Sequence, residues 1–216
     1  NWTSADVNNC IAIGQQTLDG VLTTTVSGTV AVGHQALTAL TTGTGNVAIG
    51  AGALKGHTTG NHNIAIGSGS MDGTASVPTG NTNIAMGTNS LGGAWTGTTS
   101  ENNTAIGHYT MQAAMDDCAA NLGVGNYSLF SLTTGDQNAC LGYGTGYGIT
   151  GGSYNIAIGV STMDALTTGN RNIAIGGNLC FSAASGAESD NIAIGYDAMA
   201  NLNHDSAAGN IAIGNY

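Results

Sequence analysis

The side chains that could ligate a metal ion or act as acids and bases are few in this 216-residue chain. His57 and His62 are five residues apart, with no cysteine or aspartate close by in the sequence. The acidic residues occur about once per repeat at shifting positions, for example Asp19 and Asp72, whereas hydrolysis by paired carboxylates needs two carboxyl groups about 5–10 Å apart. This distribution predicts no metal centre, no cofactor and no enzymatic activity.

One glycine-rich stretch, residues 43–48, superficially resembles a dinucleotide-binding fingerprint. That fingerprint follows a strand and opens a helix, because the pyrophosphate binds at the helix N-terminus. Here the stretch precedes an expected strand, so it fails the required context. The chain also lacks the G-x-S-x-G pattern of serine hydrolases and the H-E-x-x-H pattern of zinc peptidases.

The four cysteines form no C-x-x-C pair, and their spacing gives no support for metal binding. They are Cys10, Cys118, Cys140 and Cys180. Buried free thiols are the main interpretation, and a disulfide within or between chains is the alternative. Cys118 and Cys140 are the candidate disulfide, because they lie about one repeat apart.

Charge and hydropathy exclude two classes of partner. The net charge is −10, and Lys55 and Arg171 are the only basic residues. Binding to nucleic acid requires several cations that neutralise phosphates, and binding to an anionic lipid surface has the same requirement. No apolar run reaches 18 residues, so membrane insertion is not expected either.

The dominant feature is a pentapeptide, Asn followed by an apolar residue, Ala, a second apolar residue and Gly, which recurs twelve times over residues 1–216. The closing glycines are Gly14, Gly33, Gly50, Gly67, Gly87, Gly107, Gly125, Gly142, Gly159, Gly176, Gly195 and Gly214. A fixed period of 17–20 residues is typical of solenoids. The sequence therefore predicts one continuous, all-β, parallel β-solenoid (a β-roll) of about 12 coils, roughly 55–60 Å long at about 4.8 Å per coil.

Within each motif the residues alternate between two faces of a strand. We expect the two apolar residues, such as Ile64 and Ile66, to point inward, together with the apolar residue four positions after the Gly. The Ala between them then points outward. Because this position admits only small residues, we expect something to approach it closely, either another chain, which we favour, or the opposite sheet of the same coil. These positions are Ala48, Ala65, Ala85, Ala105, Ala157, Ala174, Ala193 and Ala212.

The invariant Gly indicates a sharp corner with a positive φ, where a Cβ is penalised. The Asn that opens ten of the motifs predicts a ladder in which stacked amides hydrogen-bond along the rod. Its members are Asn46, Asn63, Asn83, Asn103, Asn121, Asn138, Asn155, Asn172, Asn191 and Asn210. The segments 91–102, 112–120, 142–154 and 179–190 depart from the coil pattern, and specific contacts could lie there.

The two ends of the array match each other. Joining the end of one chain to the start of another gives a spacing of 16 residues between Gly214 and Gly14, close to the internal period. Open terminal coils favour pairing with further strands. We therefore expect head-to-tail stacking into filaments. Its residues would be Cys10, Ile11, Ile13, Ile211 and Ile213. The alternative is that the sequence is an excerpt of a longer repetitive polypeptide.

The motif resembles the head repeats of the YadA-like trimeric autotransporter adhesins, whose coils carry an Asn/Ser-x-Ala-Ile-Gly core. Similar repeats occur in bacteriophage tail fibres and in long bacterial surface proteins. The resemblance implies a left-handed parallel β-roll, three chains about one axis and a surface-exposed adhesive or fibrous role. Carried over, Ala48, Ala65, Ala85 and Ala157 would face a crowded or intersubunit environment.

The expected function is thus that of a structural subunit of an extracellular fibre or surface adhesin, located outside the cell, on the cell surface or on a virion. Its partners would be copies of itself, stacked head-to-tail and side by side or as trimers, and a host surface receptor. The alternative is the shaft or receptor-binding segment of a bacteriophage tail fibre. An ice-binding solenoid is a minor alternative, since no T-x-T strand recurs on every coil.

Overall fold

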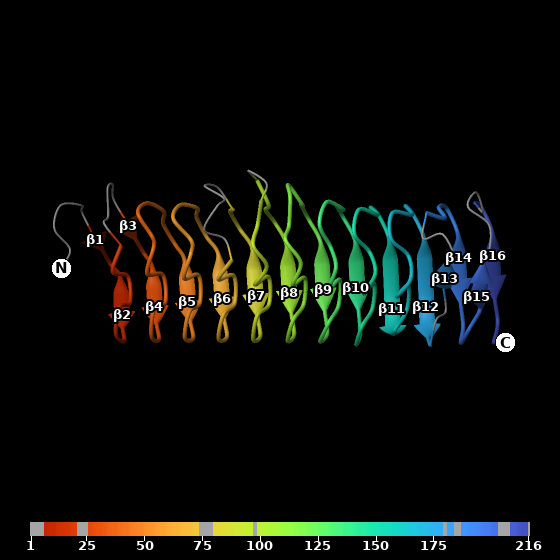
Figure 1. Cartoon of the computed structure of the whole chain (residues 1–216), viewed down its shortest axis with the longest axis horizontal. Helices are drawn as coiled ribbons and strands as arrows, with labels where there is room; N and C mark the ends of the chain where they lie inside the picture. Colours follow the sequence, from red (N-terminus) through yellow and green to blue (C-terminus); the bar gives the residue numbers. More distant parts are fainter. Residues whose placement is uncertain are drawn as a thin grey trace.

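The computed structural model describes residues 7–20, 26–73, 80–96, 99–178, 181–183, 187–202 and 208–215. The chain is an all-β parallel β-solenoid in which successive coils lie side by side along one axis (Figure 1). One sheet holds twelve strands, one for each copy of the pentapeptide. The fold class expected from the repeat period is confirmed.

The strands of this sheet are β2 (Ile11–Ile13), β4 (Val30–Val32), β5 (Val47–Ile49), β6 (Ile64–Ile66), β7 (Ile84–Met86), β8 (Thr104–Ile106), β9 (Leu122–Val124), β10 (Ala139–Leu141), β11 (Ile156–Val160), β12 (Ile173–Gly177), β14 (Ile192–Ile194) and β16 (Ile211–Ile213). Two smaller pairs accompany it, β1 (Val7–Asn8) with β3 (Val26–Ser27) and β13 (Phe181–Ala183) with β15 (Met199–Leu202).

The register is constant along the twelve-stranded sheet, because equivalent motif residues of neighbouring strands pair with one another. Ala48 of β5 pairs with Ala65 of β6, and Ala65 pairs with Ala85 of β7. Each strand is only three to five residues long, and all neighbours are parallel. The side chains of one motif position therefore form straight columns that run the length of the rod.

The inside–outside assignment made from the sequence is wrong for this sheet. The motif Ala is fully buried in β4 to β8, β11, β12 and β14, whereas the apolar residues on either side of it are half-buried or exposed. Alternation with period two holds, but its phase is inverted. Of the two sources of crowding considered for the Ala, the opposite side of the same coil is the one present.

The thinness of the coil explains this inversion. At Gly123, which replaces Ala in β9, an added Cβ would lie 2.9 Å from Thr110 Cγ2 and 3.1 Å from Met111 Cε. The space behind the sheet therefore admits only small side chains, and an Ile side chain cannot enter it. The interior is completed by the Leu or Met four residues after the Gly, which is buried as expected; the described members are Leu18, Leu37, Leu54, Met71, Leu91, Met111, Leu129, Met163 and Met199. Cys180, assigned to the same column, lies outside the described residues.

The corner after each strand is built from left-handed backbone. All twelve motif glycines have φ between 129° and 154°. Two further left-handed residues follow, for example Gln35 and Leu37 after Gly33. These turns bring the Leu or Met back under the sheet and fix how deep the interior is. Within the described ranges no helix is long and apolar enough to cross a membrane.

Candidate functional site

The motif asparagines form the ladder that the sequence predicts. Asn63 donates its backbone N–H to Asn46 Oδ1 at 2.9 Å, and its amide group donates to Gly80 O at 2.7 Å. The same bonds recur at Asn155, which donates to Asn138 Oδ1 and Gly169 O. These side chains are buried from Asn46 to Asn191. Each side-chain oxygen therefore accepts from the backbone N–H of the Asn in the next coil, as Asn46 does from Asn63. The side-chain amide donates to a carbonyl in the turn of the next coil, as Asn63 does to Gly80, so the column ties the coils together.

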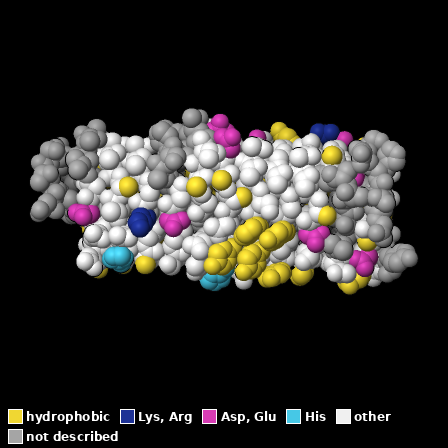
Figure 2. Space-filling view, viewed as in Figure 1, with side chains coloured by type: hydrophobic (Ala, Val, Ile, Leu, Met, Phe, Trp, Pro, Cys, Tyr) yellow, Lys and Arg dark blue, Asp and Glu magenta, His cyan; other side chains and the backbone are white. Residues whose placement is uncertain are grey.

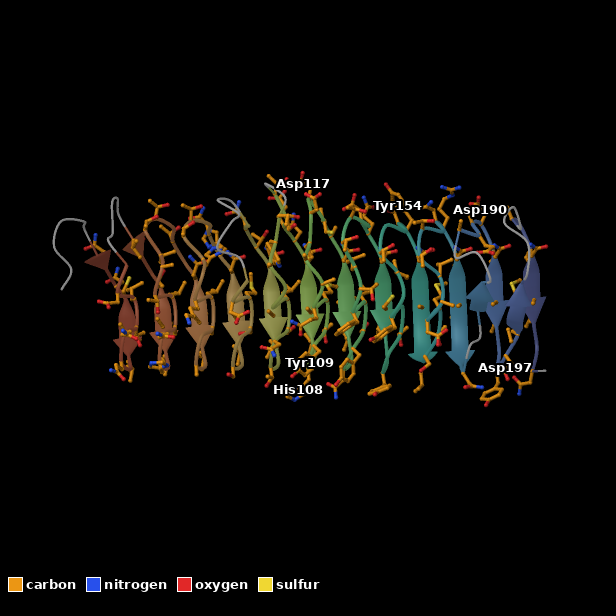
Figure 3. The ribbon with its side chains drawn as sticks, viewed as in Figure 1. His108, Tyr109, Asp117, Tyr154, Asp190 and Asp197 are labelled. Carbon is orange, nitrogen blue, oxygen red and sulfur yellow. The ribbon has the colours of Figure 1, made fainter. Side chains whose placement is uncertain are left out.

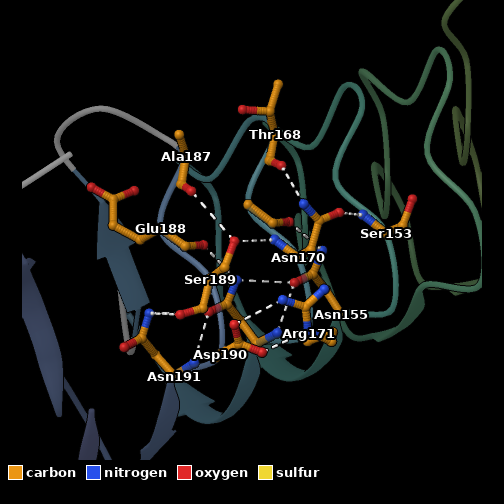
Figure 4. Close-up of polar contacts among 12 residues, drawn as sticks. Ser153, Asn155, Thr168, Asn170, Arg171, Ala187, Glu188, Ser189, Asp190 and Asn191 are labelled. Carbon is orange, nitrogen blue, oxygen red and sulfur yellow. Dashed lines mark hydrogen bonds and ion pairs between the residues drawn. The ribbon is translucent and has the colours of Figure 1, made fainter. Parts of the chain in front are cut away.

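A second polar column lies two residues before the Asn, and the sequence analysis missed it. Ser153 N–H donates to Asn170 Oδ1, and Asn170 N–H donates to Ser189 Oγ (Figure 4). Asn61 and Asp136 act in the same way on their neighbours. The recurrence of Asn, Asp or Ser at this position was a signal that could have revealed it.

One ion pair lies beside this column. Arg171 donates two hydrogen bonds to the Asp190 carboxylate, at 2.6 and 2.8 Å (Figure 4). The hydrogen bonds and charge of Arg171 hold the pKa of Asp190 below its usual range. Both side chains are about half exposed, so solvent screens the pair and it adds little to the free energy of unfolding.

The outward residues of the twelve strands form an apolar surface, which we call the isoleucine face. Its two columns contain the residues before and after the motif Ala, and Thr104 is the only one that is not apolar. Mid-sheet members such as Ile106, Ile156 and Ile158 remain 38–39% exposed although neighbours flank them on both sides. No charged residue belongs to it.

The size of the isoleucine face is close to that of a protein–protein interface. Twelve strands about 4.8 Å apart, each about 10 Å long, give a flat footprint of about 550 Å². The largest apolar patch of a typical monomer is about 300–600 Å² and is often functional. A standard interface covers about 800 Å² of accessible area on each partner, and a corrugated surface has more accessible area than its footprint.

The apolar side chains of the two terminal strands, β2 and β16, are the most exposed ones of the isoleucine face. Ile211 and Ile213 of β16 are 69% and 74% exposed, and Ile11 and Ile13 of β2 are 51% and 60% exposed. Within the described residues, each of these strands has a partner on one edge alone. Cys10, which replaces the motif Asn beside β2, is half-buried, and its thiol donates to Val26 O at 3.6 Å. The five residues predicted for end-to-end stacking thus lie at opposite ends of the sheet.

The candidate disulfide is not formed, because Cys118 and Cys140 are free thiols in different columns. Cys140 stands at the Ala position of β10, in register with Gly123 and Ala157. Cys118 lies three residues before the motif Asn, and its thiol donates to Thr133 O at 2.8 Å. Burial raises the pKa of both thiols to about 12. The interpretation of these two cysteines as buried free thiols holds.

The residues that could do acid–base chemistry do not come together. His57 is buried, its Nε2 lies 3.3 Å from Asn63 Nδ2, and burial lowers its pKa to about 4. His62 lies outside the interior, on the left-handed residue before Asn63. Among the described residues, no three His, Cys, Asp or Glu side chains are grouped so that they could hold a metal ion.

The aromatic residues do gather, at the edge of the rod that carries Tyr109 and His108 (Figure 3). Tyr109 stacks on Tyr127, whose ring lies 5.8 Å from that of Tyr143 at an interplanar angle of 73°. In the space-filling view a hydrophobic patch marks this edge on a surface with few and widely spaced charges (Figure 2). We call the rings of Tyr109, Tyr127, Phe130, Tyr143 and Tyr147 the aromatic cluster.

No protein-family model matches this chain, and no curated protein and no solved structure matches it.

Proposed function

We propose that this protein is a structural subunit of an extracellular fibre or surface adhesin that assembles with copies of itself. The observation that carries the proposal is the isoleucine face, a flat apolar surface that runs the length of the rod. Exposed apolar patches of this size mark interaction sites in soluble proteins. The partner is a second copy, because two such faces are equal in length and strand spacing.

Electrostatics supports lateral association of identical chains. The net charge is −10, which resists close approach of two copies in general. The isoleucine face has no charged residue; Asp117 and Asp190 lie at one edge of the rod and Asp197 lies at the other (Figure 3). Packing the faces together therefore buries apolar area without bringing the carboxylates into contact. The resemblance to trimeric adhesin heads favours three copies about one axis.

Head-to-tail stacking belongs to the same proposal and has its own geometry. Inside the rod, Ile192 N–H donates to Asn210 O and Gly214 N–H donates to Ile194 O. By the same pattern, Ile211 N–H and Ile213 O are the groups that a further coil would use. Such a coil can be the first one of a second copy, in which Cys10 O and Gly14 N–H occupy the matching positions. A contact of this kind does not close on itself, so it produces filaments.

The lateral contact is tested with the double variant Ile106→Arg/Ile158→Arg. Both side chains are exposed in the middle of the sheet, so the coil itself tolerates the change. We expect the wild-type chain to sediment as an oligomer at micromolar concentration and the variant to sediment as a monomer with an unchanged β circular dichroism spectrum. Thr134→Arg, at an exposed turn residue outside the face, is the matched control and keeps the oligomer. A monomeric wild type would refute the proposal.

The end-to-end contact is tested separately with Ile211→Pro. Proline removes the N–H that a further coil would need, and an edge strand accepts it. We expect electron microscopy to show filaments for the wild type and for Ile211→Ala, and short particles for Ile211→Pro. Filaments of equal length in all three would exclude stacking through β16.

A further inference from the structure

Three rings of the aromatic cluster, those of Tyr127, Tyr143 and Tyr147, border an open cavity of about 350 Å³ on the outside of the rod. Its lining residues are Tyr127, Tyr143, Gly144, Tyr147, Ser161 and Asp164, which come from consecutive coils. This volume is near the lower end of the range for ligand pockets, about 300–1,000 Å³. The cavity therefore suits a small head group rather than an extended chain.

The hollow exists because one column of side chains is interrupted. The second residue after the motif Gly is Tyr109, Tyr127, Gly144 and Ser161 in four consecutive coils. All four have left-handed backbone, with φ between 50° and 62°. At Gly144 the side chain is absent, and a Cβ added there would meet nothing closer than Ser161 Oγ at 3.5 Å. The gap is thus one of missing volume, with no change in the course of the backbone.

Aromatic rings form the walls of this gap. The rings of Tyr127 and Tyr143 are close to perpendicular. Tyr147 stacks on Phe130 with centroids 4.9 Å apart and an interplanar angle of 4°, which holds its ring in place. Tyr143 and Tyr147 are 55% and 42% exposed, so their surfaces are open to a ligand. The ring faces of tyrosine carry negative potential and attract cations.

A carboxylate lies at the same cavity with one oxygen unsatisfied. Asp164 Oδ1 is buried and has no hydrogen-bond partner, while backbone N–H groups of Asp164 and Ala165 donate to the carboxyl group. Burial raises the pKa of Asp164 above its usual value. A positively charged ligand in the cavity would stabilise the negative charge of this partly desolvated carboxylate. Neither Lys55 nor Arg171, the only basic residues of the chain, lines the cavity.

We infer that this cavity binds an organic cation with a methylated ammonium head group. Aromatic rings set at a wide angle to one another are the arrangement by which proteins recognise quaternary ammonium groups, and the Asp164 carboxylate adds attraction for a cation. The net charge of −10 also raises the local concentration of cations. This inference goes beyond self-assembly and does not depend on it, since the cavity lies past the motif Gly and outside the isoleucine face.

The test is a calorimetric titration of the 216-residue chain with choline chloride at constant ionic strength. The matched probe is 3,3-dimethyl-1-butanol, which has the same shape without the charge. We expect choline to bind and the neutral alcohol to bind at least about tenfold more weakly, since the cation–π attraction is lost. Equal binding of both, or no binding of choline, would overturn the inference. A hexose that binds in place of choline would also overturn it.

Three variants locate the site. Gly144→Tyr fills the hollow with the side chain that Tyr127 carries at the same backbone conformation, and it should abolish binding with the fold unchanged. Asp164→Asn should weaken binding of choline several-fold but leave binding of the neutral alcohol unaltered. Tyr154→Leu, at an exposed tyrosine on the opposite edge (Figure 3), is the control and should bind as the wild type does. Undiminished binding by Gly144→Tyr would show that choline binds elsewhere. The oligomeric state of each variant, measured in parallel, separates this result from the assembly proposal.

Discussion

At the scale of single residues, close contact between coils decides which side chain a position accepts. The motif Gly illustrates two restrictions at once, since its φ is left-handed and the carbonyl of the next motif Gly lies directly above it. A Cβ added to Gly50 would lie 2.5 Å from Gly67 O and 2.6 Å from Gly67 C. Both atoms belong to the backbone, so neither can move without breaking the stack.

Gly50→Ala should therefore destabilise the chain by several kcal/mol, about 3 or more, which is the range of severe steric and backbone effects. Gly177→Ala is the matched control, because its nearest neighbour would be Tyr196 at 3.9 Å and its φ is not left-handed. Chemical denaturation monitored by circular dichroism measures both. The free energy of unfolding of the control should lie within about 1 kcal/mol of the wild-type value. Similar losses for the two glycines would contradict this explanation.

A second residue-scale effect links Cys140 and Gly146. In other coils a small Ala in the strand faces a Leu or Met four residues after the Gly, as Ala157 precedes Met163. In the coil that contains β10 the larger Cys140 replaces Ala, and Gly146 replaces Leu or Met. A Cβ added to Gly146 would lie 2.8 Å from Cys140 Sγ. The two unusual residues thus compensate for each other in volume.

Gly146→Met alone should be destabilising, and the double variant Cys140→Ala/Gly146→Met should recover a large part of the loss. It restores the pair found in the coil of Ala157 and Met163, where Met163 has a φ of 57° that is close to the 66° of Gly146. A double-mutant cycle by chemical denaturation should give a coupling free energy of about 1–3 kcal/mol. Additive effects would mean that the two positions do not share one space.

At the scale of the coil, the sequence predicts the strand and its ladder but not the depth of the interior. The recurrence of Asn and Gly at fixed spacing is sufficient to place Asn155 over Asn138 and a corner at Gly159. The pattern Ile-Ala-Ile is apolar on both faces of the strand, so hydrophobicity alone does not decide whether the Ile or the Ala side chains point into the interior. The depth is set by the left-handed residues after the Gly, such as Leu37 and Leu54, and the sequence gives no sign that leucine adopts this conformation.

A further inward position, seven residues after the motif Gly, was readable but was missed. It is occupied by Leu40, Leu132, Ile149 and Leu166, all fully buried, and by His57 in one coil. Sequence analysis judged His57 by its spacing from His62 and predicted no metal site, but it did not assign the residue to this inward column. In the structure the imidazole takes the place of an aliphatic core residue.

The burial of His57 predicts a loss of stability in acid. Its pKa is about 4 in the folded chain and about 6.5 in the unfolded chain, so between these values only the unfolded state binds the proton. The free energy of unfolding therefore falls as the pH drops from about 6.5 to about 4, and this group should account for about 2 kcal/mol between pH 7 and pH 4.5.

His57→Leu, which introduces the residue that the preceding coil carries as Leu40, should remove that part of the pH dependence. Urea denaturation of the wild type and the variant at pH 7 and pH 4.5 isolates the contribution of His57. The carboxylates titrate in both proteins, so their contribution cancels in the comparison. If the difference between the two proteins does not change with pH, His57 is not buried and neutral in the folded state.

At the scale of the whole molecule, each coil contacts its neighbours through the same columns of Ala, Asn and Leu or Met. Stability of such an array is approximately a sum over coils and the interfaces between them. The sequence period is therefore also a rule for changing the length of the rod. Residues 34–50 form a 17-residue coil that is fully described, begins after Gly33 and ends at Gly50.

Duplicating residues 34–50 should give a folded chain with one more strand between β5 and β6, longer by about 4.8 Å. The inserted coil places Asn over Asn, Ala over Ala and Gly over Gly, so every interface keeps its hydrogen bonds and its packing. We expect an unchanged shape of the circular dichroism spectrum and a melting temperature equal to that of the wild type or higher. An insertion of residues 34–42 alone adds about half a coil. The strands that follow it are then shifted out of register. This insertion should lower the melting temperature or prevent folding, because it moves the next Gly away from the carbonyl column. If the two insertions behaved alike, the rod would not be held together by registered columns, and the isoleucine face would lose the regular strand spacing on which its proposed role in assembly depends.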